Sequence, residues 1–587
     1  MIDFKMIFFE NRSISALACI LASASLLGLA APALAQTASQ VTRQSYAPPV
    51  IRPVSGGLAL PVTAGLTAPA GADKLRVTPS GLEVEGGLPG LAPETTEIEA
   101  RLKDKRVTGA DLFAAARDLE AAYARAGYLL VRVSLPPQTI KDKRPLRLVI
   151  TRGYVESIDT SALPQGARGR VEAILAPLVG RPEITRTELE RRLLLAGDTP
   201  GVLLRSTLKA GDKPGATVIV VDGGYDPVTA SLSLDNSLSK ELGRYSLGLG
   251  TDFNNLLGLG EVGYLRLAGY PSFNADNIFA DDPRNRQIVA GFTLPLGTDG
   301  WWLNLEGVDS RTHPTSDFDY SMADHYQRLS TKLGYGWVRS RDFNTSSTID
   351  FDIADETQQM DVGGARSDWT EDRLRVLRLS QTADMYTTWG ALLSGSATAS
   401  FGLDAFGARH GTAELPLSRD GVEPDFAKLE LSGRYSQGLL QDRVQFSFAG
   451  KAQSSLGNVL ASSEQFSLGG FDWLSAYDSG ALEGDGGAAV RAEVAFPIVL
   501  PSLGQHATLG SAVAPYVFGA AGIAKLQQAT AVERSVTRAA AFGAGLRFGL
   551  SQKGDQNSTT LALEYAHGAA DGLDSADRIN LRFFASF

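Results

Sequence analysis

The sequence contains a single cysteine, Cys19, among its 587 residues, so a disulfide framework and a cysteine metal site are both excluded. It also lacks a basic excess. The formal net charge is −10, whereas nucleic-acid-binding proteins usually carry a basic footprint. After the N-terminal segment, no stretch is apolar over the length that a membrane-spanning helix needs. We therefore expect a protein that needs no disulfides and binds no nucleic acid.

The motifs of common catalytic and metal sites are missing from the sequence as well. The histidines are scattered and form no helical His-x-x-x-His pair: His313, His325, His410, His506 and His567. We find no zinc-ligand spacing, phosphate-binding loop or Gly-x-Ser-x-Gly elbow. The sequence therefore predicts a protein that is not an enzyme, with no metal site and no cofactor.

The chain begins with a targeting segment, residues 1–35. Basic residues flank its start, an apolar run follows, and the small-x-small site Ala33-Leu34-Ala35 precedes Gln36. This pattern predicts a secretory signal peptide. A membrane anchor and a lipoprotein signal ending at Cys19 are weaker alternatives, because small residues crowd the end of the run and the run continues past the cysteine.

Residues 36–73 are rich in proline, alanine, glycine and threonine and show no apolar period. This composition predicts an extended linker. Helices tolerate interior proline badly, so only the stretch from Gln36 to Ser45 could form a short helix.

Two units with the same predicted order of elements, β-α-α-β-β, follow at residues 74–152 and 153–225. In the first unit, apolar residues recur at three- and four-residue steps between a Thr108 N-cap and a Gly127 stop, which indicates a helix. Like-ordered units in tandem predict an internal repeat of two small α/β domains. The alternative to a binding role is that both units are stable spacers.

Each unit would present a sheet with an open edge, and an open edge can accept an extended peptide as an added strand. Two predicted strands are candidates for this role, "YLLVRVSL" and the start of "GVLLRSTLKAG". The candidate client-binding residues are Leu129, Leu130, Val131, Val133, Val202, Leu203 and Leu204.

Residues 226–587 replace the helical period with period-two alternation, as in "VTASLSL" (Val228–Leu234). One apolar face and one small or polar face predict a transmembrane β-barrel with a wet interior, rather than a soluble sandwich or propeller. At about 22 residues per strand and turn, the segment predicts roughly sixteen antiparallel strands. The final strand "RINLRFFASF" places Leu581, Phe583 and the terminal Phe587 on one face, an exposed edge that a closed barrel would cover.

Several motifs resemble one known family, the two-partner secretion translocators of the FhaC/ShlB type. "GYLLVRVSLPPQ" (Gly127–Gln138) and "LRLVITRGYVESI" (Leu146–Ile158) resemble its polypeptide-transport-associated (POTRA) domain, with a Pro-x-Gln turn and a following glycine. "SLDNSLSKELGRYSLGLGTDFNNLLGLGE" (Ser233–Glu261) resembles its opening barrel hairpin, and "FGAGLRFGL" (Phe542–Leu550) a later strand. The resemblance covers Leu75 to Phe587.

The resemblance implies an outer-membrane protein of a Gram-negative bacterium, related to the BamA assembly proteins, with two POTRA domains in the periplasm before the barrel. Its function would be to capture an unfolded exoprotein, a TpsA-like client, in the periplasm and export it to the cell surface. The implied partners are outer-membrane lipid and lipopolysaccharide, periplasmic chaperones and the barrel-assembly machinery that reads the C-terminal strand; the protein itself would be a monomer. The alternatives are a barrel-assembly factor and a diffusion porin. Many family members begin with a plug helix, although a long one is not expected here.

The resemblance also implies a lock inside the barrel. In the family, a loop after Gly-Gly reads Val-Arg-Gly-Tyr, and its arginine meets the aspartate of a Phe-x-Asp-x-Gly strand. The matching loop here is "GGFDWLSAYD", with the aligned residues Gly469, Gly470, Phe471, Trp473, Leu474, Ser475, Ala476 and Tyr477. The matching strand is "FGAAG", with Phe518, Ala520 and Gly522.

Both charged members of this lock are absent, since Ser475 stands at the arginine position and Ala520 at the aspartate position. Losing one charge alone would strand its partner, whereas losing both can be nearly neutral. We expect the loop still to lie in the lumen. The residues expected to hold it are its aromatic side chains and one carboxylate: Phe471, Trp473 and Tyr477, with Asp472 or Asp478. Ser475→Ala should then cost little secretion, and Tyr477→Ala much more.

Overall fold

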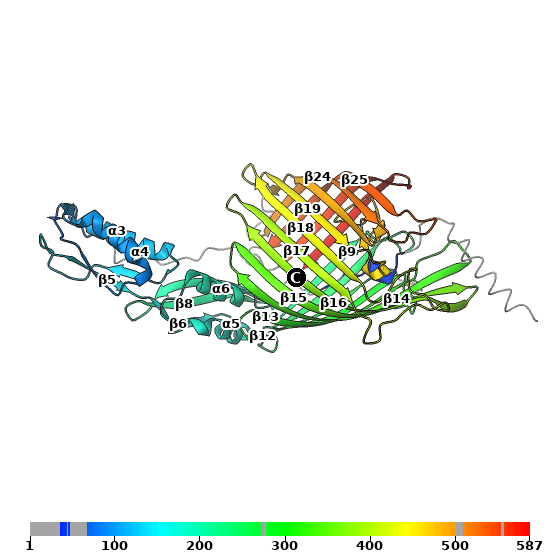
Figure 1. The fold of residues 1–587 in the computed structure, drawn as a ribbon, viewed down its shortest axis with the longest axis horizontal. Helices are drawn as coiled ribbons and strands as arrows, with labels where there is room; N and C mark the ends of the chain where they lie inside the picture. Colours follow the sequence, from blue (N-terminus) through cyan, green and yellow to red (C-terminus); the bar gives the residue numbers. More distant parts are fainter. Residues whose placement is uncertain are drawn as a thin grey trace, which may run out of the picture.

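The structure is a computed structural model that describes residues 36–43, 45–46, 67–272, 274, 277–500, 509–552 and 557–587. The predicted signal peptide, residues 1–35, lies outside these described residues. Two small α/β domains lie in a row and lead into a barrel of long strands (Figure 1). No helix in the described part of the chain is long and apolar enough to cross a membrane.

The first α/β domain has the predicted order of elements. They are β1 (Arg76–Val77), β2 (Leu82–Glu85), η2 (Pro89–Leu91), α3 (Ala92–Leu102), β3 (Val107–Thr108), α4 (Gly109–Arg125), β4 (Arg132–Ser134) and β5 (Leu146–Thr151). Thr108 caps α4 as expected: its hydroxyl accepts a hydrogen bond from the Asp111 amide, and the Asp111 carboxylate accepts one from the Thr108 amide. The Gln138 side chain donates to the Arg147 carbonyl at 2.7 Å and accepts from its amide at 3.0 Å, which fixes the Pro-x-Gln turn beside β5.

The second α/β domain repeats this arrangement. Its elements are β6 (Tyr154–Ala162), α5 (Gln165–Leu175), η3 (Ala176–Leu178), α6 (Arg186–Gly197), β7 (Val202–Ala210) and β8 (Ala216–Tyr225). The sheet orders β2-β5-β4 and β6-β8-β7 are equivalent, with the first strand parallel to the last, which lies in the middle. The predicted repeat is thus confirmed, and β4 and β7 are edge strands.

One predicted strand is wrong in extent. The pattern "YLLVRVSL" predicts a strand over Tyr128–Leu135, but β4 covers only Arg132–Ser134 and Leu129–Leu130 form a turn. The apolar pattern there reflects burial between domains, because Leu130 packs into the core of the second domain. A Cβ on Gly153 would lie 1.8 Å from the Leu130 carbonyl oxygen, so the two backbones meet closely and only glycine fits.

The barrel is closed and consists of sixteen membrane-spanning strands, as predicted. They are β9 (Val228–Asp235), β10 (Ser246–Asn254), β11 (Val262–Gly269), β12 (Asn285–Leu296), β13 (Trp301–Thr312), β14 (Tyr320–Arg339), β15 (Phe343–Val362), β16 (Ala365–Tyr386), β17 (Ala391–Gly402), β18 (Ala427–Leu439), β19 (Val444–Ser454), β22 (Gly486–Ala495), β24 (Leu509–Lys525), β25 (Val536–Gln552), β26 (Ser558–Ala570) and β27 (Ala576–Ser586). The short β23 (Ile498–Leu500) also pairs with β24. All neighbours in the barrel are antiparallel, and β27 closes it by pairing with β9.

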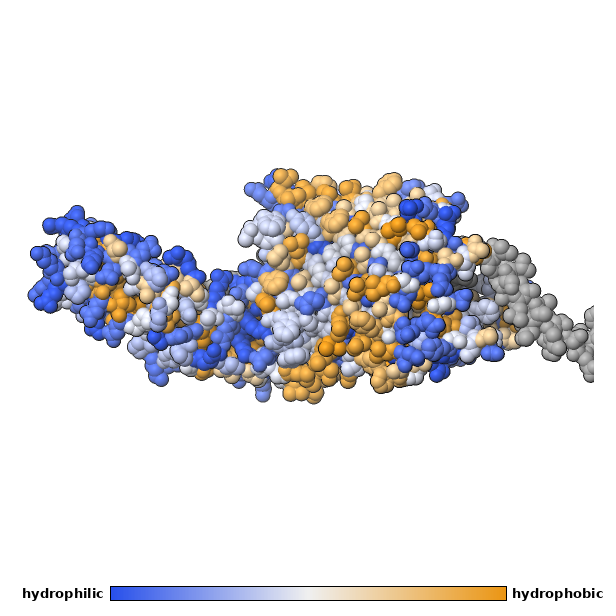
Figure 2. All heavy atoms as spheres, in the orientation of Figure 1, coloured by the Kyte–Doolittle hydropathy of each residue, from blue (hydrophilic) through white to orange (hydrophobic). Residues whose placement is uncertain are grey.

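The barrel carries apolar side chains on its outer surface and polar side chains inside, the reverse of the arrangement in a soluble protein. Apolar side chains such as Leu249, Trp337 and Ile579 are exposed on its outer surface, whereas Asn304 and Glu306 are fully buried inside. Figure 2 shows apolar residues spread over the barrel and a more polar surface on the α/β domains. Alternating side chains explain this, because successive residues of a strand face lipid and lumen in turn.

Candidate functional site: the barrel lumen

A short segment of the N-terminal region lies inside the barrel; we call residues 36–43 and 45–46 the plug. Its helix α2 (Ala38–Val41) is capped by Thr37, within the stretch that the sequence analysis allowed to be helical. Ala38 is fully buried and packs against Tyr326 and Ala354. The helix has four described residues.

Hydrogen bonds hold the plug against three neighbouring strands of the barrel wall, β13, β14 and β15. The Ala38 amide donates to Asp324 at 3.3 Å and the Ser39 amide to Glu356 at 3.1 Å. Beyond the helix, the Tyr46 amide donates to Glu306 at 3.0 Å. Buried carboxylates need such donors, so withdrawing the plug would leave these lumen acids to be hydrated by water.

The loop "GGFDWLSAYD" also lies inside the barrel, where Leu474 and Ser475 are fully buried and Tyr477 is 8 % exposed. It lies between two short strands, β20 (Phe466–Ser467) and β21 (Glu483–Gly484), that pair with each other. The loop touches the wall closely. A Cβ on Gly522 would lie 2.4 Å from the Leu468 side chain, and one on Gly568 would lie 2.6 Å from the Ala476 Cβ.

Both carboxylates of the loop face arginines of the closing strand β27. Asp472 pairs with Arg582 at 2.9 Å, and Asp478 pairs with Arg578. The Arg582 guanidinium also lies 4.1 Å from the centre of the Phe471 ring. Charge on the loop is therefore negative and charge on the wall is positive, the reverse of the pattern that the resemblance implies.

A second ion pair, missed by the sequence analysis, lies beneath Ser475. Arg491 of β22 donates to Glu564 of β26 at 2.5 Å, and Arg491 is 8 % exposed and Glu564 1 % exposed. Arg491 also donates to the loop carbonyls of Phe471 at 3.2 Å and Trp473 at 3.3 Å. The only signal in the sequence was a charged residue at an inward-facing position of each strand.

Ser475 and Ala520, the neutral residues at the two positions where the family carries a charge, lie beside this ion pair. The Ser475 hydroxyl donates to Glu564, and its carbonyl accepts from Asn580 at 2.8 Å. Ala520 is the strand neighbour of Arg491, whose guanidinium lies 3.8 Å from the centre of the Phe518 ring. Both charges thus belong to the wall, and the loop offers neutral groups to them.

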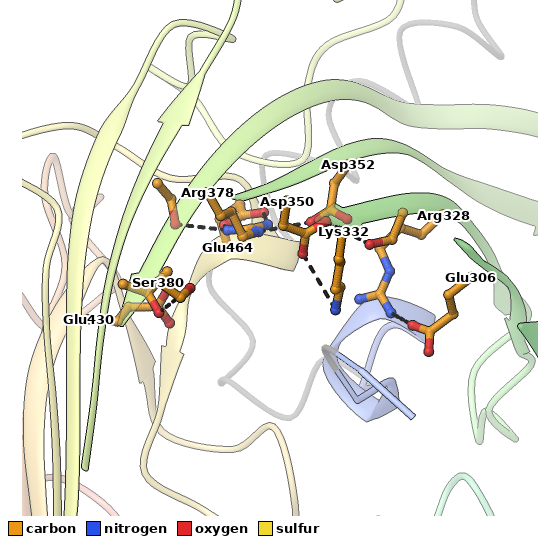
Figure 3. Close-up of polar contacts among 12 residues, drawn as sticks. Glu306, Arg328, Lys332, Asp350, Asp352, Arg378, Ser380, Glu430 and Glu464 are labelled. Carbon is orange, nitrogen blue, oxygen red and sulfur yellow. Dashed lines mark hydrogen bonds and ion pairs between the residues drawn. The ribbon is translucent and has the colours of Figure 1, made fainter. Parts of the chain in front are cut away.

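A belt of charged side chains fixes the base of the same loop to the opposite wall (Figure 3). Arg378 of β16 lies between Asp352, at 2.8 Å, and Glu464 of the 3-10 helix η4 (Ser462–Glu464). Lys428 approaches Glu464 to 2.9 Å from the other side. Burial alone would raise the pKa of Glu464, but Arg378 and Lys428 outweigh it and lower this pKa to about 2. The Glu464 carboxylate is therefore ionised throughout the physiological pH range.

The β17–β18 connection, residues 403–426, forms a lid over the same end of the lumen. Leu417 and Val422 pack with Leu460 in an apolar cluster against β16. Arg419 of the lid pairs with Asp485 at 2.5 Å, and this fully buried carboxylate also accepts from the Leu460 amide at 2.8 Å. One carboxylate thus ties the lid to the segment that leads into the loop.

The other end of the lumen is hollow and faces the second α/β domain. A cavity of about 890 Å³ is lined by barrel residues together with Ile174, Leu195 and Asp198 of that domain. Asp198 accepts two hydrogen bonds from Arg339 of β14, at 2.7 and 2.8 Å, and both side chains are largely buried. The domain is thereby fixed at the mouth of the cavity.

The candidate client-binding residues differ in accessibility. Leu130, Val131, Val133 and Val202 are 2–3 % exposed and serve the domain cores, so their side chains face away from solvent. Leu203 of β7 is 40 % exposed. Any added strand at these places would rely on the main chain of β4 or β7 and on exposed side chains such as this one.

The C-terminal residues lie at the closing seam. Five residues of β27 pair with β9, from Arg582 opposite Asp235 to Ser586 opposite Ser231. Phe587 extends the pairing by main-chain bonds to Ala230 in both directions, at 2.7 and 3.0 Å. Leu581 and Phe583 lie within the same strand, so the predicted assembly residues are also barrel-closing residues.

A closed barrel, filled toward one end and hollow toward the second of two tandem α/β domains, is the architecture of the POTRA-barrel class of outer-membrane proteins. The family model "Haemolysin secretion/activation protein ShlB/FhaC/HecB" matches residues 215–548, and "POTRA domain, ShlB-type" matches residues 77–153. The chain belongs to the ShlB/FhaC/HecB haemolysin secretion/activation family. It is an outer-membrane translocator of two-partner secretion, with its POTRA domains in the periplasm.

Individual relatives agree with this assignment. The chain is 25 % identical over 502 residues to the heme/hemopexin transporter protein HuxB of Haemophilus influenzae strain 86-028NP, covering 82 % of both chains. It is 23 % identical to the outer membrane transporter CdiB of Escherichia coli, covering 76 % of this chain and 73 % of that one. The solved structure of Escherichia coli CdiB has the same fold, with a TM-score of 0.65 at 20 % identity over 90 % of this chain and 92 % of that chain.

Proposed function

We propose that the protein receives an unfolded secreted polypeptide at its POTRA domains and exports it through the lumen after the plug and the loop move aside. The observation that carries this proposal is the asymmetry of the lumen. The cavity opens beside the second POTRA domain, whereas the plug, the loop and the lid fill the end that faces the cell surface.

Client capture by strand addition is supported by the two edge strands. β4 and β7 each lie at the edge of a three-stranded sheet, and β7 is the longer, with nine residues. An extended client segment could pair with β7 through its main chain, while the exposed Leu203 sets the register. Because four of the seven candidate side chains are buried, the backbone of the edge carries the proposal.

Further parts of the proposal concern partners. The exposed apolar belt suits outer-membrane lipid and lipopolysaccharide, and the terminal aromatic strand suits recognition by the barrel-assembly machinery after delivery by periplasmic chaperones. We propose that a single chain forms the whole conduit, since the barrel closes on itself through β27 and β9.

A reversible lock on the plug tests the export route. Ala38→Cys and Ala354→Cys place two thiols in one small buried cluster and remove no hydrogen bond from a side chain. Under oxidising conditions the disulfide should hold α2 in the lumen and stop export of a co-expressed client, and reduction should restore it. Each single variant is the control. Undiminished export by the oxidised double variant would refute an export route through the plugged lumen.

A further inference from the structure

The lumen wall beside the cavity carries a dense set of hydroxyl groups on four neighbouring strands, β15 to β18. We call this surface the hydroxyl wall. All its members line the cavity: Ser346, Thr348, Ser380, Thr382, Ser396, Thr398 and Ser432. Residues of the second POTRA domain, among them Leu195 and Asp198, line the same cavity, so the wall is reached directly from the periplasmic side.

The strand register aligns these hydroxyls in two rows across the wall. One row runs Ser346, Thr382, Ser396, Ser432, and the next runs Thr348, Ser380, Thr398 and ends at Glu430. Rows two residues apart along a strand are separated by about 7 Å, which is also the repeat between like-facing groups of an extended peptide. The wall therefore matches the period of an extended chain that lies against it.

Hydroxyls of the wall bond to one another but retain capacity toward the cavity. Ser346 and Thr382 are 2.7 Å apart, Ser380 and Thr398 2.9 Å apart, and Ser396 and Ser432 2.7 Å apart. Each hydroxyl has one donor and two acceptor lone pairs and rotates to suit its neighbour. A pair that shares one hydrogen bond can thus still bond to an N–H or a C=O group in the cavity.

Charged rows bound the hydroxyl wall on both sides. Toward the POTRA domain the adjoining row contains Asp384 and Arg434, and toward the plug it contains Asp350, Arg378 and Lys428. The wall between these rows is neutral apart from Glu430 at its end. This placement separates the hydroxyls from the ion pairs that anchor the loop.

We propose that the hydroxyl wall is the surface along which the exported chain passes, and that it suits an extended polypeptide segment of low charge; this rests on the proposed function. The strand backbones of the barrel are already paired with each other, so only side chains can bond to a client here. Neutral hydrogen bonds contribute about 1 kcal/mol each, which permits contact without trapping. A charged client side chain would lose water and, apart from Glu430 at the end of one row, find no counter-ion among the groups of the wall.

The test uses the purified full chain in planar lipid bilayers and three synthetic peptides of equal length. One peptide consists of glycine, serine, threonine and asparagine, and the others carry several added lysines or aspartates. A variant with Ser346→Ala, Thr382→Val, Ser396→Ala and Ser432→Ala removes one row without opening space. We expect the neutral peptide, added from the POTRA side, to block the current several-fold more briefly in this variant, with little change for the charged peptides.

A matched control keeps the comparison specific. Thr345→Val and Ser347→Ala remove hydroxyls from the opposite face of β15 and should leave the peptide residence time unchanged. Equal residence of the neutral peptide in the wild type and in the row variant would overturn the proposal, as would equal residence of all three peptides in the wild type.

A second measurement does not depend on the folding of the row variant. A photo-crosslinker at position 396 faces the lumen, and one at Ala397 faces outward. In cells that export a client fused to a folded domain that stalls it, position 396 should crosslink to the client and position 397 should not. A stalled client without a crosslink at position 396 would overturn the proposal for the hydroxyl wall. If the wild type does not export the client at all, the proposed function is refuted. The peptide measurement then decides the role of the hydroxyl wall.

Discussion

The two halves of the lumen are formed by the same strands and yet have opposite characters. Toward the cell surface, the plug, the loop and the lid fill the barrel and are held by buried charged side chains such as Arg491 and Asp485. Toward the periplasm, a cavity of about 890 Å³ remains, with hydroxyl groups along one wall. The half toward the cell surface binds parts of its own chain firmly, and the half toward the periplasm, with its row of hydroxyl groups, is left open. This difference indicates that the half toward the cell surface acts as the gate and that the half toward the periplasm forms the path of the client.

The largest effect on this contrast should come from Arg491→Ala, which leaves Glu564 buried without its cation. Breaking one partner of a buried pair costs about 3–5 kcal/mol, and the loop would also lose the donor to two of its carbonyls. We expect rapid cleavage of the loop by added protease and loss of client export. The double variant Arg491→Ala/Glu564→Gln should recover part of the stability, because no charge is then stranded. A double variant as unstable as the sum of both single variants would show that the two residues are not coupled.

Tyr477→Ala should open the upper half next most strongly, because it removes a packed side chain at a cost of about 3 kcal/mol. Its hydroxyl has no hydrogen-bond partner in the described part of the structure, so Tyr477→Phe is the matched control and should behave as the wild type. Ser475→Ala removes the hydroxyl bond to Glu564, a loss of about 1 kcal/mol. Export rates should rank Tyr477→Phe, Ser475→Ala, Tyr477→Ala. A Ser475→Ala protein without export would contradict this order.

Arg339→Ala should disturb the lower half and leave the gate intact. The Arg339–Asp198 pair is 3 and 10 % exposed and joins β14 to the second POTRA domain. Loss of its charge-assisted hydrogen bonds should cost about 1.5–3 kcal/mol at this joint. Spin labels on α6 and on the barrel should show a broadened distance distribution. Arg205→Ala, which breaks an exposed pair within that domain, is the control and should change nothing measurable. An unchanged distribution in Arg339→Ala would show that other contacts fix the domain.

The smallest expected effect is a pH dependence of the seated plug. Glu483 accepts a hydrogen bond from Gln40 at 2.5 Å, and burial raises the pKa of Glu483 to about 8 from an ordinary 4.5. Because this pKa is raised, the contribution of Glu483 to the stability of the seated plug is complete below about pH 4.5 and is lost as the pH rises through 8. Bilayer conductance should therefore increase between pH 7 and 9. Glu483→Gln mimics the neutral acid and should flatten this increase. Asp324 and Glu356 are the same in both proteins. A pH profile identical to that of the wild type would therefore exclude Glu483 as the titrating group.

Most of the architecture was predictable because it follows from local periodicity. A period near 3.6 and a Thr108 cap gave α4, and a period of two gave the strands of the barrel. The extent of β4 was not predictable, because burial of Leu130 in a neighbouring domain produces the same apolar pattern as a strand. The loop was located by its resemblance to the family motif after Gly469-Gly470, but the resemblance did not predict that the carboxylates lie on the loop and the arginines on the wall.

The sequence by itself determined two tandem α/β domains and a barrel of about sixteen strands, because each of these depends on residues close together in the chain. The position of the inward-folded loop followed only from the resemblance to a known family. Tertiary structure alone decided which side chains meet inside the lumen. Arg491 and Glu564 are 73 residues apart, and Ala38 lies 286 residues before Asp324. Such contacts depend on the register of every intervening strand and on the closure of the barrel, and a shift of one residue would turn strand side chains such as Arg491, Glu564 and Asp324 from the lumen to the lipid.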